Sequence, residues 1–183
     1  MPLPVRKDAD LRLGRVSLPG ANYFVTACTA ARAPVLTEPA TASRLLRTLA
    51  DLHSGGDVAF HAATIMPDHV HMLFALGGRL GLAQVVAKFK ALARDHGHAN
   101  WHWQENMFEH QLRTRESIED YGFYVFMNPY RAGLCALDVC WPWWFCPDPS
   151  SFRFLSGLGP GGTPQDSWLT EAERIESRIT GAK

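Results

Sequence analysis

The sequence lacks the long apolar run that a membrane span requires. A transmembrane helix needs about 20 consecutive apolar residues, and no segment of this 183-residue chain approaches that length, although 46% of its residues are hydrophobic. The first residues, MPLPVRKDADLRLG, contain no apolar core of the kind found in secretory signal peptides. We therefore expect a cytoplasmic globular protein with no membrane partner, and the hydrophobic content excludes wholesale disorder.

An excess of charge of one sign is also missing. Lys+Arg and Asp+Glu are equal at 18 each, which excludes a protein that holds nucleic acid by bulk positive charge. The balance is uneven along the chain, because basic residues outnumber acidic ones over residues 79–115 and acidic residues outnumber basic ones over residues 116–183. We therefore expect a local site to bind any anionic ligand, and the basic excess makes the middle of the chain the best place for that site.

Cysteine is scarce, and its spacing is irregular. The four cysteines are Cys28, Cys135, Cys140 and Cys146, and no two of them form a CxxC motif. A chain of this length does not need disulfide bonds to be stable, so we interpret them as reduced thiols. A metal held by the last three is a minor alternative.

Hydrophobic periodicity predicts an α+β fold. Apolar and β-branched runs predict strands, and leucine-rich stretches with helical spacing predict helices. The predicted strands are 22–29, 57–66, 69–76 and 107–113, and the predicted helices are 40–54, 81–95 and 116–127. The order β-α-β-β-α-β is the split βαβ, ferredoxin-like pattern, an antiparallel sheet with two helices on one face. The third helix is an addition to that pattern.

The C-terminal part of the chain predicts an extension. Asn128-Pro129 should end the third helix, and Gly122 should make that helix pliable. Residues 141–149 are apolar and interrupted by proline, which indicates a packed irregular segment, and residues 156–164 read as a flexible linker. A short helix over 170–180 should follow, opened by a Thr170-x-x-Glu173 capping box. Whether it is disordered or docks on the body or a partner stays open.

His69 and His71 are separated by one residue within a predicted strand. Alternate residues of a strand point to the same face, so the two imidazoles project side by side, while Val70 and Met72 point into the core. Neutral imidazoles bind Mn²⁺ and Zn²⁺ and combine with oxygen ligands. A (β/α)₈ barrel hydrolase would need eight βα units, and a histidine-triad hydrolase would need histidine where Leu73 stands. Two half-exposed sheet histidines without a ligand are the remaining alternative.

Tyr124 and Asn128 stand four residues apart on the third predicted helix. Residues at this spacing share a helix face. The phenol is a plausible nucleophile toward a phosphodiester, because an aryl phosphate link keeps the energy of the broken bond for rejoining. It needs nearby positive charge or a base to react at neutral pH. A core tyrosine with Asn128 as a helix cap is the alternative.

Several runs together resemble one family, the single-tyrosine HUH transposases, and among them the REP-associated tyrosine transposases. The central runs are residues 65–74 (IMPDHVHMLF) and 124–134 (YVFMNPYRAGL). Residues 108–113 (FEHQLR), 19–26 (PGANYFVT) and 141–144 (WPWW) resemble the family's flanking segments. The likeness is ordered along the chain and extends to about residue 146, so we divide the chain into a catalytic domain over 1–146 and an extension over 147–183.

This resemblance implies a fold, a metal and a reaction. The fold would be the ferredoxin-like one, with Mg²⁺ or Mn²⁺ held by His69, His71 and the amide oxygen of Asn128. Tyr124 would attack DNA and leave a 5′-phosphotyrosyl link and a free 3′-OH. The chain departs from the family at position 68, where Asp68 replaces a common asparagine, and at position 130, where Tyr130 adds a second phenol beyond Tyr124. Tyr121 is a third.

Such chemistry needs single-stranded or hairpin DNA. The candidates for holding it are Lys88, Lys90, Arg94, Arg113 and Arg115 at phosphates, with Trp101 and Trp103 stacking on bases. The hypothesis is an enzyme that nicks and rejoins palindromic repeats. A hairpin-binding protein of the same fold that no longer cuts is the main alternative, and a small zinc hydrolase is a third. A homodimer stays open.

Overall fold

Five strands form one antiparallel sheet in the order β4-β1-β3-β2-β5, in a computed structural model that describes residues 17–94 and 100–180. The strands are β1 (Asn22–Cys28), β2 (Val58–Ile65), β3 (His69–Leu76), β4 (Phe108–Gln111) and β5 (Trp144–Phe145). The first four occupy the positions that the sequence predicts and confirm the split βαβ arrangement. The hairpin β2–β3 lies at the centre, with β1 and β4 on one side and β5 on the other.

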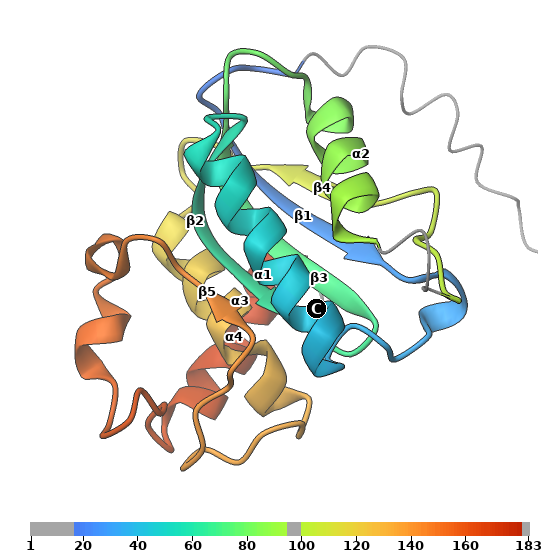
Figure 1. Cartoon of the computed structure of the whole chain (residues 1–183). Helices are drawn as coiled ribbons and strands as arrows, with labels where there is room; N and C mark the ends of the chain where they lie inside the picture. The colour runs from blue at the N-terminus through green and yellow to red at the C-terminus, as the bar shows by residue number, and fades with distance from the viewer. Residues whose placement is uncertain (1–16, 95–99, 181–183) are drawn as a thin grey trace, which may run out of the picture.

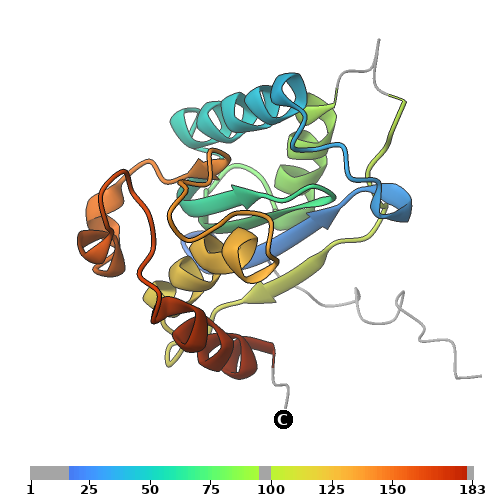
Figure 2. The same ribbon diagram turned by 90° about the horizontal axis from the view of Figure 1, so that it is seen from below.

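Helices cover both faces of this sheet. Helices α1 (Pro39–Ser54) and α2 (Leu82–Ala93) pack on one face, and α3 (Ile118–Arg131) packs on the other. Helix α4 (Trp168–Thr180) lies outside α3, so that this side of the molecule has two helical layers (Figures 1 and 2). Within the described residues, no helix is both long and apolar enough to cross a membrane.

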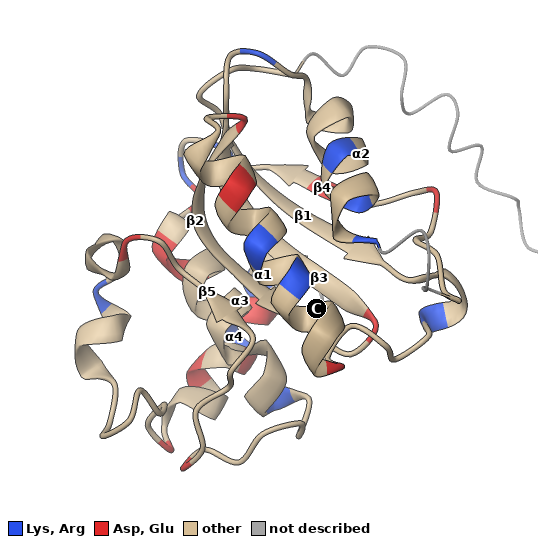
Figure 3. Cartoon of the chain, in the orientation of Figure 1, with Lys and Arg blue, Asp and Glu red and all other residues tan. Residues whose placement is uncertain are grey.

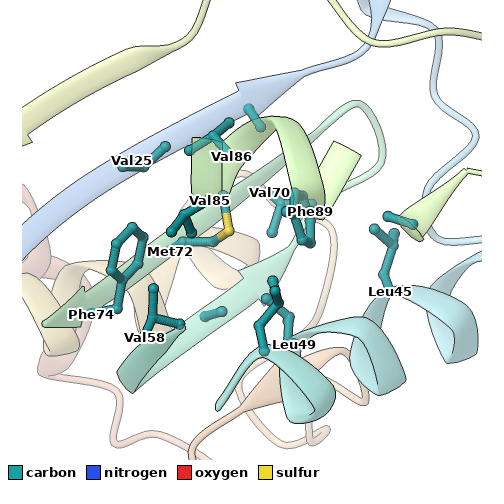
Figure 4. Close-up of a cluster of buried hydrophobic side chains, with 14 of the residues drawn as sticks. Val25, Leu45, Leu49, Val58, Val70, Met72, Phe74, Val85, Val86 and Phe89 are labelled. Atoms are coloured by element: carbon teal, nitrogen blue, oxygen red, sulfur yellow. The ribbon is translucent and has the colours of Figure 1, made fainter. Parts of the chain in front are cut away.

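Alternate residues of the strands supply two separate cores. Val25, Met72 and Phe74 point toward α1 and α2 and pack with Leu49 and Phe89 in the first core (Figure 4). The intervening residues point to α3, and their apolar members form a second core with it. Because alternate strand residues point to opposite faces, the sheet has two distinct sides. We call them the α1/α2 side and the α3 side, and the two histidines lie on the α3 side.

Helix α3 runs through the Asn128-Pro129 pair, which the sequence analysis placed at its end. The prediction was wrong because only one hydrogen bond depends on the missing Pro129 N–H, while residues 121–130 are all buried by tertiary packing. The helix ends instead at Arg131, and it is followed by the C-cap Ala132 and by Gly133, which has a φ of 67°. Asn128 is therefore a helical residue that points into the structure, rather than a cap.

Gly122 allows close packing against α3, a role that the sequence did not indicate. A Cβ atom at this position would lie 2.1 Å from Cε1 of Phe152, whose ring is buried against α3. Only glycine allows the ring to come this near to the helix backbone. The segment after β5 is thus fitted closely to the helix that carries Tyr124.

The C-terminal residues complete the second core. Trp144 and Phe145 form a short strand on the edge of β2, where an irregular segment was expected, because backbone pairing with β2 decides their conformation. Residues 156–164, expected to be a linker, contain a turn closed by the Gly159 N–H, which donates to Thr163 O at 2.8 Å. Helix α4 begins at Trp168, so Thr170 lies within its first turn and does not cap it.

Candidate metal and nucleophile site

The two histidines of β3 present the same ring nitrogen to one point. Nε2 of His69 and Nε2 of His71 lie 3.0 Å apart, and the rings meet edge to face. Both project from the α3 side of the sheet, since they alternate with Val70 in the core of the α1/α2 side. The strand periodicity predicted this pairing correctly.

The other nitrogen of each ring has a hydrogen-bonding partner. Nδ1–H of His69 donates to Oδ1 of Asp68 at 2.7 Å, and Nδ1 of His71 is hydrogen-bonded to Oγ1 of Thr26 at 2.8 Å. Partners at Nδ1 fix ring orientation and tautomer, which is the usual arrangement behind metal-binding histidines. The aspartate that departs from the family pattern thus has a defined place in this site.

Both imidazoles favour the neutral form. Burial lowers the pKa of His69, and the Asp68 carboxylate only partly opposes this effect. Burial also holds the pKa of His71 well below its usual range, and the nearby His69 and Arg32 lower it further. Because a metal binds the deprotonated ring nitrogen, these pKa shifts prepare the pair for a cation near neutral pH.

Asn128 brings an amide oxygen to the same place. Its Nδ2 donates to the backbone oxygen of Tyr124 at 3.0 Å, one helical turn earlier. The Asn128 side chain accepts a hydrogen bond from His71, which raises the pKa of that imidazole against the effect of burial; the amide oxygen is therefore the atom directed at the ring. The continuation of α3 through Pro129 makes this contact possible.

These groups fit a divalent cation. The facing Nε2 atoms of the two histidines and the amide oxygen of Asn128 are donor atoms of the types that bind such a cation. Thr64, paired with His71 across the sheet, also has a buried hydroxyl without a hydrogen-bond partner in the described part of the chain. No three His, Cys, Asp or Glu side chains gather as a metal-binding cluster among the described residues. The cysteine alternative is therefore unsupported, and the histidine pair depends on the amide as its third group.

Tyr124 lies directly beside this pair, on the same side of the sheet. Its ring centroid is 5.7 Å from that of His71 and 5.8 Å from that of Phe24, which stacks on His71. The side chain is 8% exposed. Helix α3 carries both Tyr124 and Asn128 to the histidines, as their spacing predicts.

The other two phenols of α3 are already engaged. The hydroxyl of Tyr121 donates to Glu116, and burial together with this carboxylate raises its pKa far above the usual range. The hydroxyl of Tyr130 accepts the backbone N–H of Trp141 at 3.0 Å, and burial raises its pKa as well. Of the three, Tyr124 is the phenol that faces the histidines.

Two arginines at the site were missed by the sequence analysis. Arg32 pairs with Asp68 at 2.7 Å from a turn in which Ala31 and Arg32 both have positive φ, a conformation that residues with side chains rarely adopt. The Arg131 guanidinium lies 5.7 Å from the centroid of the Tyr124 ring and forms an ion pair with Glu176 of α4. Arg131 belongs to the NPYRAGL run, which could have drawn attention to it, whereas nothing in the sequence marks Arg32.

The predicted DNA-binding lysines lie on the α1/α2 side of the sheet. Lys88 of α2 is hydrogen-bonded at 2.5 Å to Asp57, a buried carboxylate. The ammonium group of Lys90 donates to the backbone oxygen of Gln104 at 2.6 Å (Figure 3 shows the basic residues of α2 in blue). Both cations therefore stabilise loops in this conformation, on the face opposite the histidines.

Trp101 and Trp103 are core residues. They are 8% and 9% exposed and pack against each other, and the Trp103 indole donates to the backbone oxygen of Lys90. This burial contradicts the expectation that their faces are free for bases. The reason is that the loop before β4 folds back over α2 and fills the space beside Phe89.

The remaining basic candidates are dispersed. Arg113 and Arg115 are exposed on the loop after β4, and Arg94 is half-buried at the end of α2. Lys90 and Arg113 meet in a groove of about 1000 Å³ between α2 and β4. Glu109 and Gln111 also line this groove from the face opposite the histidines, so it is separate from the candidate site.

The fold and these side chains define a class of site, a histidine pair on a ferredoxin-like sheet that faces a tyrosine on an added helix. The model of the family "Transposase IS200 like" matches residues 17–114, more than half of the chain. The chain therefore belongs to the IS200-like transposase family. The matched residues include the histidine pair but end before α3, so the places of Tyr124 and Asn128 rest on the geometry above.

One solved structure supports the fold. The chain is similar to a REP-associated tyrosine transposase bound to a REP hairpin, with a TM-score of 0.58, 23% identity, and coverage of 71% of this chain and 79% of that one. It also resembles a putative transposase from Deinococcus radiodurans, with a TM-score of 0.44, 18% identity, and coverage of 56% and 87%. No curated protein gives a match.

Proposed function

We propose that this transposase-family chain is a metal-dependent enzyme that cleaves and rejoins single-stranded or hairpin DNA through Tyr124. The observation that carries the proposal is the meeting of His69, His71, Asn128 and Tyr124 on one face of the sheet. The solved relative that was bound to a REP hairpin supports a palindromic hairpin as the substrate class.

In the proposed reaction, the Tyr124 hydroxyl loses its proton and its oxygen attacks the scissile phosphorus. The bond from phosphorus to the 3′ oxygen of the preceding nucleotide breaks, and that oxygen takes up a proton. The products are a 5′-phosphotyrosyl ester and a free 3′-OH. Attack of a 3′-OH on the ester reverses these bond changes and rejoins strands without ATP.

His69, His71 and Asn128 would hold Mg²⁺ or Mn²⁺, which supplies Lewis-acid polarisation and orientation of the scissile phosphate. Asp68 and Thr26 keep the two imidazoles turned with Nε2 toward that position. Arg131, above the Tyr124 ring, adds positive charge next to the group that becomes an anion and later a leaving group.

Arg32 contributes a second charge at the other side of the histidines. Its side chain is 55% exposed while it contacts Asp68, so its guanidinium can also reach an incoming phosphate. The exposed Arg113 and Arg115 remain candidates for holding more distant phosphates. The two lysines of α2 would need to leave their present partners to do the same.

The test is formation of a covalent protein–DNA adduct. Full-length protein is incubated with Mn²⁺ and single-stranded hairpin oligonucleotides taken from palindromes beside its gene, and the adduct is followed on a denaturing gel. We expect an adduct in the wild type and in Tyr121→Phe and Tyr130→Phe, none in Tyr124→Phe, and none in His69→Ala.

The alternative is a hairpin-binding protein that no longer cuts. Tight binding of the same oligonucleotides with no adduct in Mg²⁺ or Mn²⁺ would support that alternative and contradict the proposed enzyme. An adduct that persists in Tyr124→Phe would instead assign the nucleophile to another residue.

A further inference from the structure

The geometry points to Phe108 as a stacking platform for a DNA base next to the histidine–tyrosine site, an inference that rests on the proposed function. Phe108 is the first residue of β4, and it is 59% exposed. The large apolar side chains around it on this side of the sheet are buried in the second core. Among the described residues, Phe108 is the most exposed of the large apolar side chains, so its ring is accessible to a ligand.

The register places this ring in line with the site. Phe108 pairs with Thr26, and Thr26 pairs with His71, so the three residues form one row across β4, β1 and β3. Directly paired residues of antiparallel strands point to the same face, and Thr26 is hydrogen-bonded to His71 on that face. Two strand spacings separate Phe108 from His71, about 10 Å, a distance that a neighbouring nucleotide can bridge.

The ring is also supported from beneath. Phe24 contacts Phe108 edge to face, with 6.1 Å between ring centroids, and Phe24 stacks on His71 at 5.4 Å. A side chain held by its neighbour loses little further freedom when a ligand binds, which favours stacking. The exposed aromatic surface that was expected at Trp101 and Trp103 is therefore found on β4 instead.

The chemistry selects a nucleobase as the occupant. A base has an apolar face of similar size to the phenyl ring, and base–aromatic stacking needs no particular sequence. The histidines would hold the scissile phosphate, and the unpaired base beside it would lie on Phe108. A duplex would offer no free base face, so this platform predicts a preference for single-stranded flanks.

The experiment measures stacking separately from chemistry. Hairpin oligonucleotides with single-stranded flanks carry 2-aminopurine at one flank position at a time, and fluorescence is followed during titration with full-length protein in EDTA. We expect strong quenching at one position in the wild type. Phe108→Ala and Phe108→Leu should lose that quenching and bind about 5- to 100-fold more weakly, while Phe108→Trp should restore both.

Leu92→Ala is the matched control, because Leu92 is another exposed apolar residue, 49% exposed on α2, and it should bind like the wild type. Unchanged quenching in Phe108→Leu would overturn the inference, and if the wild type still formed its adduct with Mn²⁺, the proposed function would stand. Loss of a dimer in Phe108→Ala by analytical ultracentrifugation, with unchanged quenching, would assign the ring to a protein interface instead. A wild type that neither binds nor forms an adduct would refute both proposals.

Discussion

Replacing Gly122 with alanine should destabilise the protein, although alanine is the better helix former. In an exposed helix the change would stabilise by about 1 kcal/mol. Here the new Cβ would lie 2.1 Å from Cε1, 2.5 Å from Cζ and 2.7 Å from Cδ1 of Phe152. The ring is 2% exposed and backed by Phe154, so it has no free direction. Overpacking costs about 1–3 kcal/mol. Because all three contacts are shorter than 3.0 Å, we take the upper part of that range, about 2–3 kcal/mol, and expect a net loss of about 1–2 kcal/mol after the propensity gain of about 1 kcal/mol.

The assay is urea denaturation of four proteins that form a double-mutant cycle, the wild type, Gly122→Ala, Phe152→Ala and the double variant. Phe152→Ala should cost about 3–5 kcal/mol by itself, and in that background Gly122→Ala should stabilise by about 1 kcal/mol. The coupling free energy is then about 2–3 kcal/mol. Gly78→Ala, where a Cβ meets nothing within 4 Å, is the control and should be nearly neutral.

The same variant should affect chemistry more than binding. Tyr124 follows Gly122 by two residues, so a shift of α3 away from Phe152 moves the phenol relative to His71. We expect the rate of adduct formation to fall while hairpin affinity changes little. If Gly122→Ala were stabilising in the wild-type background, the argument from close packing would be refuted.

Three further predictions follow from single contacts. The pKa of Asp57 is lowered, mainly by the hydrogen bond from Lys88. The contribution of this carboxylate to stability is therefore present above the unfolded pKa of about 3.9 and is lost as the pH falls through the folded pKa. Asp57→Asn should reduce that loss of stability at acid pH, measured by urea denaturation at several pH values, and an unchanged pH profile would contradict the prediction. Trp103→Ala should lower the free energy of unfolding by about 3–5 kcal/mol, and a variant that keeps its stability but loses DNA affinity would show that the indole meets DNA. Asp68→Ala should weaken Mn²⁺ binding about 10- to 100-fold by calorimetry, and Asp68→Asn, which keeps an acceptor for His69, should weaken it less.

The sequence predicts those features of the fold and the site that depend on local hydrophobic pattern and residue spacing. The strand 69–76 and the period of two place both imidazoles on one face, and the helical spacing of Tyr124 and Asn128 brings them there together. These features depend only on the strand and helix periods, which can be applied directly to the spacing of residues in a single sequence.

What sequence could not predict depends on contacts between distant segments. Pro129 reads as a helix stop, because local rules do not include the packing that keeps α3 continuous. Arg32 reaches the site through a strained turn, and Trp103 is buried by a loop that folds over α2. A tryptophan looks the same in sequence whether it fills a core or stacks on a base, and only the tertiary structure separates these cases.

Helix α3 is enclosed between the sheet and the residues that follow β5, with Phe152, Ala172 and Ile175 buried against it. A chain shortened at residue 146 would bare a continuous apolar surface on the very helix that bears Tyr124, and such surfaces drive aggregation. Recombination between genes would therefore give a stable protein only when the breakpoint leaves residues 147–180 joined to α3, so this segment and Tyr124 should be inherited as one unit.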